Sequence, residues 1–154
     1  MRVCRRDLQE IPRQALPNTY DSARPFGSVL YFLVTREANI HVHRIRFDQM
    51  YHHYLGDPLE VRLLCPDGSG HIATVDPDLR IGMRPQLFIP GGTFHVARLK
   101  PGSSYALIGT TEWPGVEPSD VGLGSREELI EAYPELREEI SVREEISAFT
   151  DRVH

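Results

Sequence analysis

Short runs in which apolar and polar residues alternate occupy the middle of the chain. They predict β-strands at Ser28 to Val34, Ile40 to Phe47, Met50 to Leu55, Leu59 to Cys65, His71 to Val75, Gln86 to Ile89, Phe94 to Leu99 and Tyr105 to Thr110. Segments rich in Gly, Pro and Asp separate the runs, as at Pro66 to Gly70 and Pro90 to Gly92. Strands that recur about every ten residues are typical of a β-sandwich or barrel. The pattern therefore predicts an all-β domain.

The two ends of the chain depart from this pattern. Ser125 to Glu128 reads Ser-Arg-Glu-Glu, which has the Ser-x-x-Glu spacing of a capping box, so a helix is predicted to begin near Arg126. Apolar residues continue at helical spacing into a C-terminal tail over about 125–150. The first 25 residues contain three prolines and predict an irregular arm with one short helix at Arg5 to Glu10. We expect a single domain, 1–154, with its barrel core at about 26–112.

Length and composition restrict the class of protein. The chain has 154 residues, of which 40% are hydrophobic and 25% charged, as in soluble globular domains rather than disordered chains. No apolar run reaches the length of a membrane span, and the N-terminal residues lack an apolar signal core. The two cysteines, Cys4 and Cys65, are too few for a disulfide framework and indicate reduced thiols in the cytoplasm.

Charge is concentrated at the C-terminus. The formal net charge is -5, and residues 125–154 hold nine acidic and four basic side chains, which leaves the rest of the chain balanced. A balanced body offers no basic field for nucleic acid. We therefore expect neither a nucleic-acid nor a membrane partner, and a small molecule becomes the favoured ligand.

Histidines in the strand runs supply the candidate chemistry. In Ile40-His41-Val42-His43 the period of two places His41 and His43 on the same face of a strand, where two imidazoles can share one metal ion. The alternative is a pair of surface histidines on an edge strand. Further along the chain come Gln49, Gly56 and the segment Pro90-Gly91-Gly92-Thr93-Phe94-His95, in that order. This order bears on the choice between a metal site and a pair of surface histidines.

Set out in that order, the residues resemble the two motifs of the cupin superfamily. Further segments resemble its Cupin_5 (DUF985) group of predicted sugar-epimerase-like proteins: Asp48 to Leu59, Arg84-Pro85-Gln86, Tyr105 to Gly109, Pro114-Gly115 and Arg126 to Pro134. The resemblance implies a double-stranded β-helix, the jelly-roll barrel of the cupins. It also implies that His41, His43 and His95 are metal ligands, that Gln49 stands at the position of the fourth, carboxylate ligand, and that the protein is a homodimer paired through sheet edges.

The chain departs from the group in ways that favour a metal site. Its relatives usually carry Trp-Gln where this chain has Phe94-His95, and a Glu where it has Gln49. The chain has thus gained a histidine and lost acidic groups. Three neutral imidazoles suit one divalent metal ion, with Fe(II) favoured and Zn, Ni, Mn or Cu as alternatives. Such an ion keeps an open position for substrate or oxygen, which indicates a catalytic rather than a structural site.

Other residues are candidates for proton transfer and substrate binding. Alternation along the strand places Tyr51 and His53 on the side of Gln49, and His52 on the other side unless a bulge intervenes. Tyr51, His53 and His52 are predicted catalytic groups, with a hydrogen-bonded barrel or interface histidine as the alternative for His52. The predicted substrate-binding residues are Arg44, Arg98 and Tyr105, because guanidinium groups recognise carboxylates and phosphates. Their alternative is a surface or interface position.

Three functions remain open from the sequence. The first is a metal-dependent cupin enzyme acting on a small organic substrate, either an oxygenase, and so an oxidoreductase, or a Lewis-acid isomerase or cyclase. The second is a metal-free epimerase or isomerase of a nucleotide-linked sugar, in which His52 or His53 and a tyrosine act as base and acid. The third is a cupin that binds a small ligand without catalysis.

Overall fold

The strands follow the predicted runs closely. The computed structural model describes residues 9–134 and 137. The main strands are β3 (Ser28–Thr35), β4 (Ile40–Ile45), β5 (Gln49–Gly56), β6 (Leu59–Leu64), β7 (Gly70–Val75), β8 (Gln86–Ile89), β9 (Phe94–Leu99) and β10 (Tyr105–Glu112). Short elements complete them: β1 (Glu10–Ile11), β2 (Arg24–Pro25), β11 (Val121–Leu123), the 3-10 turns η1 (Arg13–Ala15), η2 (Leu79–Ile81) and η3 (Pro118–Asp120), and the helix α1 (Arg126–Ala132).

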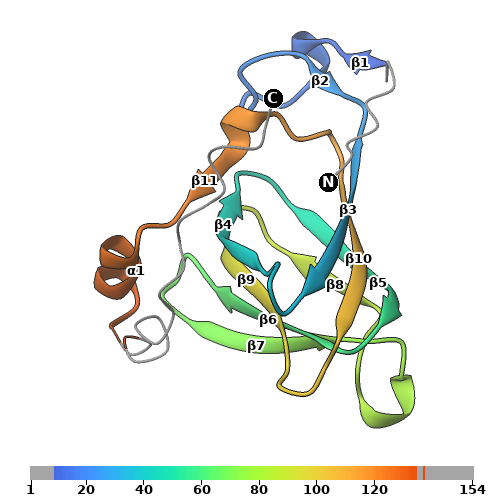
Figure 1. Cartoon of the computed structure of the whole chain (residues 1–154). Helices are drawn as coiled ribbons and strands as arrows, with labels where there is room; N and C mark the ends of the chain where they lie inside the picture. Colours follow the sequence, from blue (N-terminus) through green and yellow to red (C-terminus); the bar gives the residue numbers. More distant parts are fainter. Residues whose placement is uncertain (1–8, 135–136, 138–154) are drawn as a thin grey trace.

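Two antiparallel sheets face each other as a jelly roll. One sheet has the order β3-β10-β5-β8 and the other β11-β4-β9-β6-β7, while β1 and β2 form a small hairpin of their own (Figure 1). The prediction of an all-β jelly roll is confirmed. In the described residues the two main sheets remain separate in their hydrogen bonding, so the barrel is a sandwich of two curved sheets rather than a closed ring.

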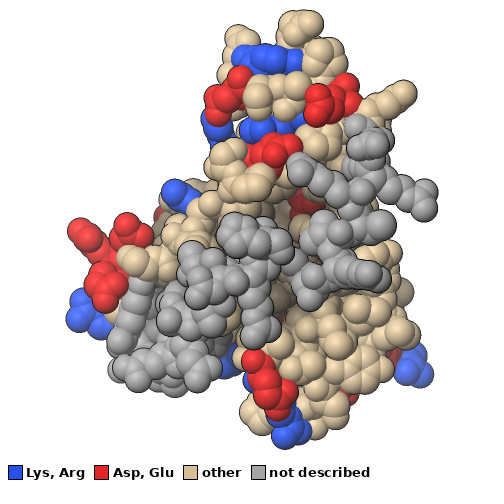
Figure 2. Space-filling model, turned by 45° about the horizontal axis from the view of Figure 1, so that its top comes forward, with Lys and Arg blue, Asp and Glu red and all other residues tan. Residues whose placement is uncertain are grey.

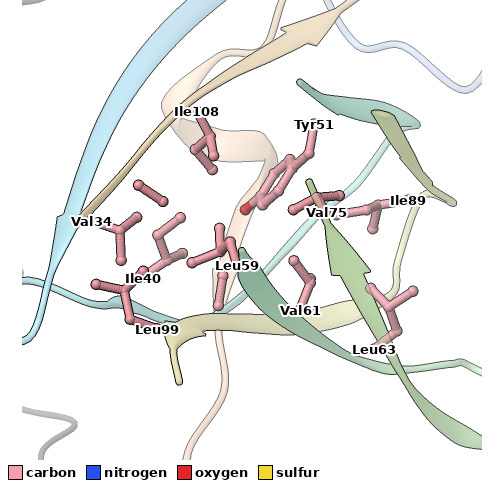
Figure 3. Packing of buried hydrophobic residues seen from close by; sticks show 12 residues of the cluster. Val34, Ile40, Tyr51, Leu59, Val61, Leu63, Val75, Ile89, Leu99 and Ile108 are labelled. Atoms are coloured by element: carbon pink, nitrogen blue, oxygen red, sulfur yellow. The ribbon is translucent and has the colours of Figure 1, made fainter. Parts of the chain in front are cut away.

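An apolar core fills the space between the sheets. Figure 3 shows side chains from both sheets meeting there, and the buried cluster consists of Val34, Ile40, Tyr51, Leu59, Val61, Leu63, Val75, Ile89, Ala97, Leu99, Ala106 and Ile108. These residues are the inward members of the alternating runs, because successive side chains on a strand point to opposite faces. Burial of this apolar area is the main term that stabilises the fold.

The helix begins where its capping box predicts. The Ser125 hydroxyl accepts a hydrogen bond from the Glu128 amide, and the Glu128 carboxylate accepts one from the Ser125 amide. Leu129 and Tyr133 then pack on Leu64 in a second, smaller core. The rest of the predicted C-terminal helix lies outside the described residues.

The N-terminal arm differs from its prediction. Glu10 belongs to strand β1, so the helix predicted over Arg5 to Glu10 does not reach its expected end, and residues 5–8 lie outside the described part. The arm is held to the C-terminal side of the sandwich by a buried ion pair between Arg24 and Asp120. Among the helices of the described residues, none has the length and apolar content needed to span a membrane.

Candidate functional site

Two turns bring His43 and His95 together between the sheets. The two histidines are partners in the β4–β9 ladder. The turn before β9 is locked to the turn after β4 because the Gly92 amide donates to the Ile45 carbonyl (2.8 Å) and the Gly91 amide to the Asp48 carboxylate (2.8 Å). A β-carbon at Gly91 would lie 2.7 Å from the Arg46 carbonyl oxygen, so this close approach requires glycine. The Pro-Gly-Gly segment thereby fixes the position of His95.

The two imidazoles form a close pair with defined tautomers. Their ring centroids are 4.2 Å apart at 58°. Nδ1 of His43 lies 2.9 Å from the His41 carbonyl oxygen, and Nδ1 of His95 lies 3.1 Å from the Thr93 carbonyl oxygen. A carbonyl oxygen can only accept, so each ring carries its proton on Nδ1 and a lone pair on Nε2. Backbone contacts of this kind orient histidine ligands in metal sites.

Gln49 and Tyr51 complete the surroundings of His95. The Gln49 amide nitrogen lies 3.3 Å from His95 Nε2, and the edge of the His95 ring meets the Tyr51 ring at a centroid distance of 5.6 Å. All three side chains are buried, so the Gln49 amide and the Tyr51 ring enclose the His95 imidazole away from solvent.

Burial keeps both imidazoles neutral. Loss of solvation lowers the pKa of His43; the hydrogen bond to the His41 carbonyl opposes this shift only in part, and a charge on His41 lowers the pKa by a smaller amount. For His95, burial first and the neighbouring His43 second lower the pKa to about 3. Burial also raises the pKa of the Tyr51 hydroxyl far above its usual value. At neutral pH the site therefore presents uncharged donor atoms.

These residues fit a metal ion at two of the three expected histidine positions. His43 and His95 offer adjacent Nε2 lone pairs, and rotation of the Gln49 amide would present its oxygen instead of its nitrogen. His41 is not gathered with them: the described residues contain no group of three His, Cys, Asp or Glu side chains arranged to hold a metal ion. The reason is a shift of the β4–β9 register between Ile40 and His43, which breaks the strict alternation on which the His-x-His prediction relied.

Glu112 is a site residue that the sequence reasoning missed. It is the last residue of β10, it is buried, and its carboxylate accepts a hydrogen bond from the Ser28 hydroxyl at 2.5 Å. The register of β10 with β5 pairs Thr111 with Met50, so the next position brings Glu112 beside Gln49. Parity with the inward residues Ala106 and Ile108 of the same strand was the signal that could have identified it.

Replacing Glu112 by glutamine is expected to stabilise the protein at neutral pH. Burial raises the pKa of Glu112, and the hydrogen bond from the Ser28 hydroxyl opposes the shift only in part. The folded state thus binds this proton more tightly than the unfolded state, so wild-type stability falls as the pH rises above the ordinary pKa of 4.5 and through the folded value. Glutamine does not ionise, so the Glu112→Gln protein does not lose stability in this way as the pH rises.

Urea unfolding of wild type and Glu112→Gln with a chelator present measures the effect. We expect a gain on the order of 1 kcal/mol at about pH 7 that disappears at about pH 3.5. A gain of equal size at both pH values would show that the ionisation of Glu112 is not its cause.

Several predicted site residues do not reach this interior. His52 is on the outer face of β5, where its Nε2 contacts the Thr111 hydroxyl (2.7 Å), because it is one residue out of phase with the buried Tyr51. Arg44 and Arg98 follow the inward His43 and Ala97 and therefore point outward, Arg44 over the Phe94 ring and Arg98 in an ion pair with Glu60. Tyr105, at the start of β10, is exposed. These four residues are corrected to outer-surface positions.

His53 is buried on the inner face but at some distance from the pair. It lies four residues after Gln49 along β5, which is roughly 13 Å of strand. Its Nε2 donates to the Asp57 carbonyl (2.9 Å), and its Nδ1 is buried without a partner in the described residues. The residues that the structure brings together are thus His43, His95, Gln49 and Tyr51, with Glu112 added.

Two facing antiparallel sheets with a histidine pair between them define a cupin. The family model of the Cupin superfamily (DUF985), Cupin_5, matches residues 2–124, so the chain belongs to this family. A comparison with curated protein sequences finds no match.

Solved structures share the fold. A hypothetical protein from Leishmania major is 23% identical with a TM-score of 0.76, and the match covers 87% of this chain and 86% of that one. A protein from Shewanella oneidensis is 29% identical with a TM-score of 0.72, covering 79% and 77%. A dTDP sugar isomerase from Desulfovibrio desulfuricans is 19% identical with a TM-score of 0.51, covering 77% and 81%, a likeness that is one of fold alone.

Proposed function

We propose that this cupin is a metal-dependent enzyme that acts on a small organic substrate between its two sheets. The observation that carries the proposal is the pair of neutral imidazoles, His43 and His95: both donate their Nδ1 proton to the backbone, and their Nε2 lone pairs face a ligand position, where that of His95 now meets the Gln49 amide. A metal ion requires this state, since it binds neutral imidazole in competition with protons.

The proton affinity of His95 favours metal binding over acid–base catalysis. A general base works best when its pKa lies near the operating pH. Burial lowers the pKa of His95 to about 3, which makes it a weak base at neutral pH. A low pKa does not weaken the case for a metal ligand, because fewer protons then compete for Nε2. The metal-free epimerase or isomerase would take its base from His52 or His53, and neither lies at the pair: His52 is on the outer face of β5, and His53 is roughly 13 Å along the strand from Gln49. That enzyme therefore has less support in this geometry than the metal-dependent one.

The chain's own residues have distinct roles in this proposal. His43 and His95 would hold the ion through Nε2, and Gln49 would offer its amide oxygen; His41, which is not gathered with them, would have to turn toward the pair to serve as a third imidazole. The ion, Fe(II) in our proposal, supplies Lewis acidity or the redox chemistry of an oxygenase. Tyr51 shields the ion from water on the core side and keeps its hydroxyl proton at neutral pH. Glu112, hydrogen-bonded to Ser28, provides a carboxyl group that can hold a proton near the substrate.

Metal analysis followed by reconstitution tests the proposal. We expect protein purified without added metal to contain up to one divalent ion per chain. After chelation and anaerobic loading with Fe(II), turnover of small organic acids, alcohols and sugar nucleotides is screened with and without oxygen, and we expect any turnover to require the ion.

Each outcome of the screen separates the candidate functions. Turnover that needs both Fe(II) and oxygen supports an oxygenase, and turnover that needs only the ion supports an isomerase or cyclase. Epimerisation of a sugar nucleotide that continues after chelation would instead establish the metal-free enzyme. Saturable ligand binding without turnover or metal would indicate a binding protein.

A further inference from the structure

The outer surface of the five-stranded sheet is a feature that the proposed function does not use. Paired residues on neighbouring strands share a face, and Leu63 points into the core beside His95, so its neighbours along β6 point outward. We call the outward positions the arginine face: Arg44, Glu60, Arg62, Ile72, Thr74, Val96 and Arg98. They lie on the opposite side of the sheet from His43 and His95, so binding to the arginine face is independent of the metal-dependent function.

Positive charge dominates the arginine face. Its arginines outnumber its single glutamate, Glu60, which accepts a hydrogen bond from Arg98 at 2.8 Å, so the face keeps a net positive charge. The arginines also repel each other: burial is the main cause that lowers the pKa of Arg62, and the charge of Arg98 lowers it further than Glu60 raises it. An acidic segment laid over the face would relieve this repulsion.

Apolar side chains lie among these arginines. Arg62 is paired with Ile72 on one neighbouring strand and with Val96 on the other, and Ile72 exposes 49% of its surface. Such a mixture of apolar and basic groups suits an amphipathic helix that brings apolar side chains and carboxylates together.

The helix α1 brings the chain to the edge of the arginine face. Leu129 and Tyr133 pack on Leu64, whose ladder partner Phe94 lies on the same outer side of the sheet. The Tyr133 hydroxyl lies within hydrogen-bonding distance of the carbonyl oxygens of Leu64 (3.1 Å) and Cys65 (2.9 Å). The residues that follow Tyr133 in the sequence therefore start beside the arginine face.

The acidic side chains of α1 itself face solvent rather than the sheet. Glu127, Glu128 and Glu131 are exposed, and Figure 2 shows acidic groups gathered at the left of the view, where α1 lies in Figure 1. Acidic groups from α1 thus do not neutralise the arginine face.

The sequence after α1 supplies acidic and apolar groups in a matching pattern. Residues 138–154 hold five acidic and two basic side chains. Apolar residues recur there at helical spacing: Val142, Ile146, Phe149 and Val153. Glu138, Glu139 and Glu145 stand three or four positions from members of this apolar stripe, which places them along its borders in a helix. The pattern predicts an amphipathic helix whose apolar stripe has acidic borders.

The same segment has the length to cross the arginine face. Its seventeen residues extend about 25 Å as a helix. The six residues of β6 extend about 20 Å. A helix that starts beside the Leu64 end of β6 can therefore reach both Arg62 and Arg98.

We propose that residues 138–154 dock on the arginine face of their own chain as an amphipathic helix. The apolar stripe of the helix covers Ile72 and Val96, and the carboxylates along its borders pair with the arginines. Charge complementarity selects this acidic segment over a neutral or basic one. Docking continues the cover that α1 begins on the outer side of the five-stranded sheet.

Hydrogen–deuterium exchange of the full chain, measured by mass spectrometry, tests the proposal. We expect the amides of residues 138–154 to exchange at least about tenfold more slowly than in a synthetic peptide of the same sequence. Arg62→Glu reverses a charge at the centre of the arginine face and is expected to bring this exchange to within about threefold of the peptide. The exchange of β6 and β9 should not change, which would show that the sheet remains folded.

A charge swap separates docking from a folding defect. Glu138→Lys/Glu145→Lys should remove the protection of the segment as Arg62→Glu does, and the three substitutions combined should restore at least part of it. The matched control is Glu144→Lys/Asp151→Lys, which makes the same charge change on the opposite side of the predicted helix and should leave the protection unchanged.

Loss of protection in the first two variants, with recovery in the charge swap, supports the proposal. Wild-type amides that exchange as fast as those of the peptide would overturn it and leave the arginine face to an acidic partner protein. Protection that survives both charge reversals would overturn it too. So would protection that rises with protein concentration, because the segment would then bind to a second copy of the chain.

Discussion

Replacing His95 with alanine is expected to reduce metal binding by at least tenfold. His95 is fully buried, is held by the Thr93 carbonyl and stands 4.2 Å from the His43 ring, so its loss leaves one imidazole of the pair. Mutation of a group that only hydrogen-bonds to a metal ligand lowers the metal affinity about 10–100-fold. Removal of the ligand itself should lower the affinity by at least as much. Metal content by elemental analysis and titration of the chelated protein with Fe(II) or Zn(II) would measure the change.

Comparison of four variants shows which imidazoles hold the ion. His43→Ala should match His95→Ala, and His71→Ala is the control, since His71 is exposed on β7, the edge strand of the same five-stranded sheet. His41→Ala distinguishes two versions of the site: a loss equal to the others places His41 among the ligands, and a small loss means that Gln49 and solvent complete the set. Metal occupancy indifferent to His95→Ala would show that the imidazole pair is not a metal site.

The sequence contained most of the fold because the strand signal is local. Every predicted run between Ser28 and Thr110 became a strand with limits within two residues of those expected, and the helix began at the Ser125 capping box. Alternation of side chains and turn chemistry both act over a few residues, so they can be read without knowing the tertiary contacts. The order of the strands in the two sheets is a long-range property, and the resemblance to the cupin motifs, rather than the local strand signal, predicted the jelly roll that the structure has.

The site was harder to predict, for two physical reasons. The register shift between Ile40 and His43 is decided by how β4 meets β9, so the face of His41 could not be derived from β4 alone. Glu112 was overlooked because a carboxylate at the end of an apolar strand usually faces solvent, and only pairing with Ser28 across the sheet accounts for its burial. Arg44 and Arg98 were chosen for their chemistry, whereas strand parity alone would have placed them outside.

The buried ion pair between Arg24 and Asp120 is expected to have the largest effect on stability. The Arg24 guanidinium donates to the Asp120 carboxylate at 2.9 Å and to the Ser22 hydroxyl at 3.0 Å. The second Asp120 oxygen accepts from the Glu117 amide (2.9 Å), and both side chains are almost completely buried. Arg24→Met replaces the guanidinium group by an uncharged side chain of similar volume. The Asp120 carboxylate then stays buried without its partner. Loss of one partner from a buried pair costs about 3–5 kcal/mol, because the remaining charge keeps its desolvation penalty.

An exposed ion pair between Asp21 of the N-terminal arm and Arg46, which follows β4, provides the control. Arg46 binds the Asp21 carboxylate at 2.7 Å, but the two side chains are 45% and 73% exposed, so solvent screens the pair and Arg46→Met should cost much less stability than Arg24→Met. Urea unfolding at neutral pH gives both free energies, and exchange of the Gly115 amide, which donates to the Pro25 carbonyl (2.8 Å), reports whether the arm opens locally. The double variant Arg24→Met/Asp120→Leu should recover much of the loss, since it leaves no unpaired charge. If Arg24→Met costs no more than Arg46→Met and leaves the exchange of Gly115 unchanged, the buried pair does not hold the arm to the sandwich.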